Sequence, residues 1–144
     1  MSQPLPLFIL RDKMNRIGKE YNDFCMLVGE PIIGKNTWVG YFTLLDGSGG
    51  LIIGQNCDIA SGVHIYTHST TNRVLQNIPR TNRDMIQKEV TTIGNNVFIG
   101  ANTTILMGCM VGDFSVIGAN SVLLERTVVG KREMWAGNPA KRIK

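Results

Sequence analysis

The chain has 144 residues, which fits one domain, and a net charge of +4. No stretch reaches the roughly 18 consecutive apolar residues of a membrane span, and the apolar start lacks the basic region and cleavage site of a signal peptide. We therefore expect a cytoplasmic protein without stable membrane insertion. The three cysteines are widely spaced and form no CxxC pair, which argues against a disulfide framework and against a zinc site.

Residues 1–30 are predicted to form an N-terminal capping segment that is helical. Apolar residues recur in it at spacings of three and four, the pattern of an amphipathic helix: Leu7, Leu10, Met14, Ile17, Tyr21 and Phe24. We expect this helix to cover the open end of the repeats that follow, because terminal repeats otherwise expose apolar groups. Binding to a membrane surface is the alternative.

Residues 31–134 carry a six-residue repeat in two blocks. Each hexad begins with an aliphatic residue, has a small or β-branched residue at most of its fifth positions, and often has glycine at its second. In the first block, which slips by two residues at "GSGG", the hexads begin at Ile33, Val39, Leu45, Ile53, Ile59 and Ile65. In the second block they begin at Ile93, Ile99, Ile105, Val111, Ile117, Leu123 and Val129.

A period of six matches neither a regular strand nor a helix. A short strand followed by a tight turn accounts for it, with the large aliphatic residue and the small fifth residue both pointing inward. Glycine, which tolerates unusual backbone angles, is expected where the chain bends. Stacked coils then form a narrow parallel solenoid. Cys57 and Cys109 occupy small inward positions, so we predict that they are buried packing residues and not nucleophiles.

Residues 71–92 interrupt the repeat with a polar stretch that holds four basic and two acidic residues. An interruption of this length is predicted to project from the solenoid wall as a functional loop, although a tolerated surface insertion is the alternative. His64 and His68, the two histidines of the chain, stand just before this loop. Neither occupies an inward position of the hexads, so both are expected to face outward.

Residues 135–144 form a basic tail. From Glu125 to the end there are six basic and two acidic residues, which accounts for the whole net charge. Such a tail suits a phosphorylated cofactor, nucleic acid or anionic lipid, or is simply a solvated terminus. Nucleic-acid binding has little support, because the basic stretch is short and lacks interleaved aromatic residues.

The hexads resemble the [LIV]-[GAED]-x-x-[STAV]-x repeat of the hexapeptide-repeat acetyltransferases over roughly residues 30–144. "IASGVHIYTHS" at 59–69 resembles the stretch that carries the family's catalytic histidine, and "WAGNPAKRIK" at 135–144 resembles its closing motif. "LLDGSGG" at 44–50 is similar to members that modify surface sugars. The resemblance implies an all-β solenoid, a left-handed parallel β-helix with triangular coils of three hexads. It also implies a homotrimer with acetyl-CoA bound between subunits.

The resemblance further implies that His68 is the catalytic residue. An imidazole, whose pKa is ordinarily near 6.5, can take the proton of an acceptor hydroxyl as its oxygen attacks the thioester of acetyl-CoA. No covalent enzyme intermediate is required, and His64 is the weaker candidate for this base. The acceptor-binding candidates are Asp46, His64 and Tyr66. Asp46 either orients His68, binds sugar hydroxyls or is a turn aspartate bonded to its own backbone.

The cofactor-binding candidates lie in the tail. Lys141 and Arg142 follow the closing motif and suit the phosphates of CoA. Trp135, which either packs on the cofactor or belongs to the core, precedes Ala136 and Gly137 of the same motif. Gly40 stands where some relatives carry an acceptor-binding asparagine, which argues against a simple galactoside as acceptor.

These residues make O-acetylation of a sugar in a surface-polysaccharide or O-antigen precursor the first hypothesis, with a small-molecule sugar and CoA as partners. An N-acetyltransferase acting on a nucleotide sugar would use the same base. A non-enzymatic scaffold is an alternative of another class. A γ-type carbonic anhydrase needs three histidines per site, whereas this chain has two, spaced H-x₃-H, so no metal is expected.

Overall fold

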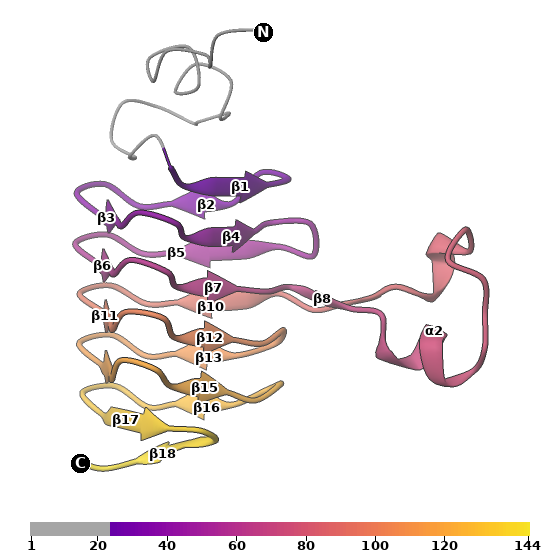
Figure 1. Ribbon diagram of the computed structural model, residues 1–144. Coiled ribbons are helices and arrows are strands. Elements are labelled where there is room, and N and C mark those ends of the chain that lie inside the picture. Colours follow the sequence, from indigo (N-terminus) through magenta and orange to yellow (C-terminus); the bar gives the residue numbers. More distant parts are fainter. Residues whose placement is uncertain (1–23) are drawn as a thin grey trace, which may run out of the picture.

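The computed structural model describes residues 24–144, which stack into a column of triangular coils with a long arm on one side (Figure 1). The predicted all-β solenoid, a left-handed parallel β-helix, is confirmed. Most of the capping helix predicted in residues 1–30 lies outside the described residues. Among the described helices, none is long and apolar enough to cross a membrane.

Three parallel sheets form the sides of the column. The first sheet contains β1 (Met26–Val28), β4 (Leu44–Asp46), β7 (His64–Ile65), β12 (Thr104–Ile105) and β15 (Val122–Leu123). The second contains β2 (Ile32–Ile33), β5 (Leu51–Ile53), β10 (Thr91–Ile93), β13 (Met110–Val111) and β16 (Val128–Val129). The third contains β3 (Trp38–Val39), β6 (Asp58–Ile59), β11 (Phe98–Ile99), β14 (Val116–Ile117), β17 (Met134–Gly137) and β18 (Ala140–Arg142).

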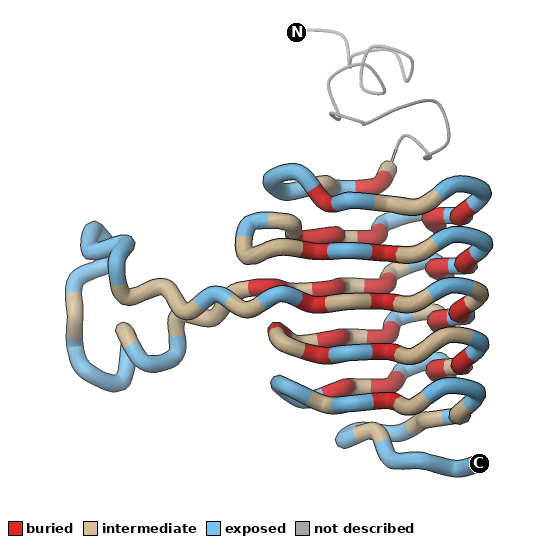
Figure 2. Tube along the Cα trace, turned by 180° about the vertical axis from the view of Figure 1, so that it is seen from behind, coloured by how far each residue is buried: buried red, intermediate tan, exposed pale blue. Residues whose placement is uncertain are grey.

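The core is the interior of this column, and the residues that contribute to it are coloured red along the stacked coils in Figure 2. In-register pairing stacks hexad starts on one another, as in the first sheet, where Ile65 lies between Leu45 and Ile105. Every predicted hexad start is buried except Ile33, which is partly buried in the terminal coil. Cys57 and Cys109 are buried as predicted, and burial raises the pKa of both thiols.

Glycine takes positive φ at some corners of the coils, as predicted, for example at Gly62. The corner between the second and third sheets is made by non-glycine residues with positive φ, such as Asn36, Asn56 and Asn96. Asparagine tolerates this left-handed region better than most residues. Gly100, at a second hexad position, instead lies close to the next coil, where an added Cβ would stand 2.4 Å from the nitrogen of Ala119.

The paired strands extend beyond the predicted limits of the repeat, residues 31 and 134, at both ends of the column. At the N-terminal end, β1 already pairs in parallel with β4. At the C-terminal end, β17 pairs in parallel with β14, and β18 folds back antiparallel on β17. The predicted basic tail is therefore a hairpin that closes the last coil (Figure 1).

The predicted projecting loop is also confirmed, and we call residues 68–90 the arm. It leaves the column as an antiparallel ribbon of β8 (His68–Ser69) and β9 (Gln87–Lys88). Beyond the ribbon it forms α2 (Thr71–Leu75) and the 3₁₀ helix η1 (Arg83–Met85), which the sequence did not predict. Its end rejoins the wall at β10, so Thr91 and Thr92 of the predicted loop belong to the second sheet.

Candidate functional site

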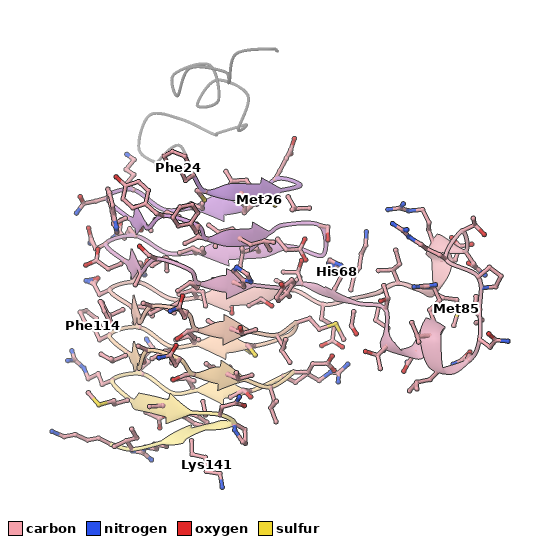
Figure 3. The ribbon with its side chains drawn as sticks, in the orientation of Figure 1. Phe24, Met26, His68, Met85, Phe114 and Lys141 are labelled. Atoms are coloured by element: carbon pink, nitrogen blue, oxygen red, sulfur yellow. The ribbon has the colours of Figure 1, made fainter. Side chains whose placement is uncertain are left out.

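His68 stands where the chain leaves the first sheet and enters the arm (Figure 3). It begins β8 and lies opposite Lys88 of β9. A salt bridge between Glu89 and Arg126 holds the returning strand of the arm against a later coil. The histidine is therefore fixed from both sides of the ribbon, while its side chain remains 37% exposed.

Asp46 lies beneath His68, at the end of β4 in the preceding coil. Its side chain is 1% exposed, and its Oδ2 lies 2.6 Å from Nδ1 of His68. The backbone N–H of Thr67 donates to Oδ2 at 2.9 Å, and that of Ser48 donates to Oδ1 at 2.9 Å. Asp46 thus contacts His68 and also bonds to the backbone of its own turn, a geometry that fits two of the roles considered for it.

The surroundings of Asp46 determine its ionisation. Burial raises the pKa of this carboxyl, but the hydrogen bonds from Ser48, Thr67 and His68 together outweigh burial and lower the pKa to about 2. Asp46 is therefore a carboxylate at neutral pH and has no proton to give. The 2.6 Å contact therefore requires a proton on Nδ1 of His68, and in the neutral imidazole this leaves the lone pair on Nε2.

The turn formed at the two-residue slip in the repeat holds Asp46 in place. In the turn after β4, the N–H of Gly49 donates to Oγ1 of Thr67 at 2.8 Å, and that hydroxyl donates to the carbonyl of Asp46 at 2.8 Å. A Cβ on Gly49 would lie 2.1 Å from the carbonyl oxygen of Thr67, so only glycine permits this approach. Sequence reasoning missed Thr67 and Ser48, although the slip itself marked the turn that they complete.

A groove of about 360 Å³ opens beside His68. Tyr66 lines it with His68, and residues 69–71 contribute hydroxyl groups. Later coils supply Leu106 and Met107, which give the groove an apolar wall, and Glu125. Sequence reasoning missed these three residues because only the stacking of coils brings them beside the arm.

His64 lies near this groove but does not line it. It is half-buried on β7, and its Nδ1 lies 3.4 Å from the hydroxyl of Tyr66. The two rings meet edge to face, with centroids 6.1 Å apart. His64 can therefore position Tyr66, and the structure does not place it beside Asp46.

The predicted cofactor-binding residues lie in the terminal hairpin, away from His68 and outside the groove of their own chain (Figure 3). Trp135 packs partly against the core and donates its Nε1–H to Glu133 at 2.8 Å. Arg142 lies 3.3 Å from the same carboxylate. The hydrogen bonds from Trp135 and Gly130 and the charge of Arg142 lower the pKa of Glu133. Trp135 and Arg142 thus help to close the column.

The other three residues of the closing motif differ in their surroundings. Ala136 packs against Gly118, where an added Cβ would lie 2.9 Å from the Cβ of Ala136. Gly137 has a φ of 106° and donates its N–H to Oγ of Ser121 at 3.2 Å. Lys141 is exposed on β18 and belongs to no salt bridge within residues 24–144. Its ammonium group is therefore available to an anionic ligand.

No group of three or more histidine, cysteine, aspartate and glutamate side chains that could hold a metal ion occurs in the described part of the chain. His64 and His68 point to different neighbours, the one to Tyr66 and the other to Asp46.

The low pKa of Asp46 predicts a loss of stability in acid. Its pKa lies below the ordinary value of 3.8, so the stabilisation is complete above about pH 4 and is lost as the pH falls towards 2. For a group that is 1% exposed, the shift corresponds to about 2 kcal/mol. Urea denaturation at pH 7, 4, 3 and 2 should show this fall in the free energy of unfolding for the native protein. An Asp46→Asn variant should lack that part of the fall, and parallel curves would contradict the assignment.

Two family models match the chain in its two repeat blocks. Residues 32–67 match the hexapeptide repeat of succinyl-transferase, and residues 91–131 match the bacterial transferase hexapeptide with six repeats. The two matches together cover more than half of the chain. The chain belongs to the hexapeptide-repeat family of bacterial transferases.

Individual relatives of this hexapeptide-repeat chain include acetyltransferases. A probable macrolide acetyltransferase of Lysinibacillus sphaericus is 34% identical over 65% of the chain and 59% of the relative. A galactoside O-acetyltransferase of Escherichia coli is 36% identical over 78% of the chain and 52% of the relative. The chain thus spans between half and three fifths of these curated relatives.

Among solved structures, the fold is similar to that of AntD, an N-acyltransferase from Bacillus cereus in complex with dTDP and coenzyme A. The TM-score is 0.73 at 24% identity, over 85% of the chain and 68% of AntD. This likeness shows that the two share the β-helical fold.

Proposed function

We propose that the protein transfers an acetyl group from acetyl-CoA to a hydroxyl of a sugar in a surface-polysaccharide or O-antigen precursor. The observation that carries the proposal is the 2.6 Å contact between Nδ1 of His68 and Asp46 at the edge of an open groove. The names of the macrolide and galactoside acetyltransferase relatives support acetyl transfer as the class of reaction.

The geometry supports a separate role for each nitrogen of His68. Nδ1 is held by the ionised Asp46, so Nε2 is free to accept the proton of an acceptor hydroxyl. The acceptor oxygen attacks the acetyl carbonyl as the proton leaves, and the CoA sulfur departs with the electrons of the broken thioester bond. His68 then returns its proton to that sulfur, so no bond to the enzyme is formed. The three buried cysteines are not needed as nucleophiles.

The acetyl end of acetyl-CoA suits the groove, whose apolar wall of Leu106 and Met107 lies beside His68. Lys141 is the most suitable partner for a CoA phosphate, because Arg142 is already paired with Glu133. The terminal hairpin does not line the groove of its own chain. A homotrimer in which the hairpin of one subunit serves the groove of its neighbour would bring the two together. This homotrimer and the cytoplasmic location remain proposals.

Transfer to an amino group of a nucleotide sugar is the second candidate. The fold of AntD, which was crystallised with dTDP and coenzyme A, favours it, and the same base would serve. The two products differ chemically, because hydroxylamine cleaves an acetyl ester and leaves an acetamide intact. Release of radiolabelled acetyl groups from the product by hydroxylamine would support O-transfer, and retention would support N-transfer.

Calorimetric titration of acetyl-CoA into the protein tests the proposal. We expect saturable binding, and Lys141→Met should weaken it about tenfold through loss of a charged hydrogen bond. Lys35→Met, which removes an exposed lysine at a corner remote from the hairpin, should leave the affinity unchanged. No binding at millimolar acetyl-CoA by folded protein would overturn the proposed function and leave the scaffold reading.

A further inference from the structure

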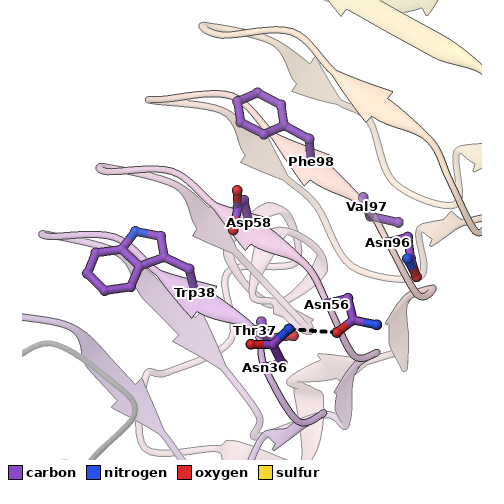
Figure 4. Close-up of a pocket in the computed structure, with 8 residues that line it drawn as sticks. All are labelled: Asn36, Thr37, Trp38, Asn56, Asp58, Asn96, Val97 and Phe98. Atoms are coloured by element: carbon purple, nitrogen blue, oxygen red, sulfur yellow. Dashed lines mark hydrogen bonds between the residues drawn. The ribbon is translucent and has the colours of Figure 1, made fainter.

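A second groove lies on the third sheet, at its corner with the second sheet (Figure 4). Its volume is about 580 Å³, and no residue between 24 and 144 lines both this groove and the one beside His68. We call it the Trp38–Phe98 groove. Its lining includes Asn36, Trp38, Asn56, Asp58, Asn96 and Phe98.

Two exposed aromatic rings stand on this groove. The parallel register places Trp38, Asp58 and Phe98 at equivalent positions of β3, β6 and β11. Because neighbouring strands are about 4.8 Å apart, the two aromatic positions are separated by roughly 10 Å, with the carboxylate between them. Trp38 is 50% exposed and Phe98 is 46% exposed. An exposed ring offers a flat apolar face whose negative quadrupole attracts C–H groups.

Fixed polar groups line the corner side of the groove. Asn36 donates from Nδ2 to Oδ1 of Asn56 at 2.8 Å, as Figure 4 shows. Asn36, Asn56 and Asn96 all have positive φ at their corners, so their positions are set by the coil. Within residues 24–144, no side chain bonds to the amide of Asn96 or pairs with the carboxylate of Asp58. Donors and an acceptor thus remain unused beside the rings.

We propose that the Trp38–Phe98 groove binds a chain of uncharged sugars. A pyranose ring has one face of C–H groups and an edge of hydroxyl groups, and the groove matches both. The C–H faces stack on Trp38 and Phe98, while hydroxyl groups donate to Asp58 and accept from the asparagine amides. The span of roughly 10 Å between the rings suits a disaccharide or a longer segment.

The charge of the groove selects among ligands. Among the described residues, Asp58 is the only charged one that lines it, so a sugar phosphate or a uronate would be repelled. A second copy of the chain is a less suitable occupant. A dry interface over this face would bury the carboxylate of Asp58 without a partner on its own chain, which is costly. The two grooves are separate, so the binding proposed here does not depend on the reaction proposed for His68.

Saccharide binding can be measured directly by calorimetry with maltohexaose, cellohexaose and chitohexaose as separate probes. We expect at least one of them to bind. Trp38→Ala should weaken that binding about tenfold, and Asp58→Asn should weaken it severalfold. Met110→Ala also truncates a large exposed apolar side chain, at a 55% exposed position of the second sheet, and should leave saccharide binding unchanged. His68→Ala should also leave it unchanged, which separates this site from the transferase proposal.

Sedimentation of the same variants tests whether a second copy of the chain occupies the groove instead. If no hexasaccharide binds at millimolar concentration, the proposal is wrong. It is also wrong if Trp38→Ala and Met110→Ala weaken binding equally. A lower oligomeric state of Trp38→Ala, with Met110→Ala unaffected, would show instead that the groove lies between copies of the chain. Circular dichroism and thermal melting should confirm that each variant is folded.

Discussion

Replacing His68 with alanine is expected to lower kcat by about 10²–10⁴-fold, the usual contribution of a positioned base. This corresponds to roughly 3–5 kcal/mol of activation free energy. The fold should survive, because the His68 side chain is 37% exposed and the β8–β9 ribbon is paired through its backbone. Steady-state transfer from acetyl-CoA to a sugar acceptor, with melting curves alongside, measures both effects.

The other histidine of the chain provides the matched control. His64 contacts Tyr66 and does not line the groove, so His64→Ala should change KM for the acceptor and leave kcat within severalfold. Acetyl-CoA binding by calorimetry should persist in both variants. If His64→Ala lost kcat while His68→Ala retained it, the base would be misassigned.

Replacing Asp46 with asparagine is expected to reduce kcat by a similar order, about 10²–10⁴-fold. The amide N–H can donate a hydrogen bond to Nδ1 of His68, which the ionised carboxylate cannot. Nε2 then carries the imidazole proton and can no longer accept one from the acceptor. With its amide nitrogen turned towards His68, asparagine keeps an oxygen for the N–H of Ser48, but the N–H of Thr67 loses its acceptor, so a lower melting temperature should accompany the loss of kcat.

The tautomer itself can be observed by nitrogen NMR. In the native protein at pH 8, the ¹⁵N shifts of His68 should show protonation at Nδ1, and in Asp46→Asn they should show protonation at Nε2. A purely structural role for Asp46 would not move the proton between the nitrogens. Ser48→Ala is the matched control, since its hydroxyl lies 3.3 Å from the same Nδ1 and should not set the tautomer.

Much of the fold followed from one sequence period. A repeat of six residues specifies strand and turn lengths together, so the buried positions from Val39 to Val129 could be predicted individually. The corners were less predictable, because asparagine, phenylalanine and arginine all adopt positive φ there. The arm escaped detailed prediction because α2 buries no residue, which leaves no apolar periodicity to read. The predicted domain limits stay a prediction.

Sequence analysis could predict only those residues of the candidate site that a local sequence pattern marks. His68 was found because it stands at the end of a repeat block, and Asp46 because it breaks the glycine position beside a slip. Their 2.6 Å contact depends on stacking successive coils, which no local pattern displays. Met107 lines the groove for the same reason, although it lies 39 positions after His68 in the chain. The roles of these residues in catalysis remain predictions.

The place where the arm joins the column has a consequence for local opening. The arm departs after β7, which pairs with both β4 and β12, and returns into β10, which pairs with both β5 and β13. In a stacked solenoid each coil depends chiefly on its immediate neighbours, so fraying begins at the two ends. Amide hydrogens of these inner strands should therefore exchange among the slowest, while those of the arm exchange quickly. His68 lies at the boundary between the slowly exchanging strands of the column and the rapidly exchanging arm.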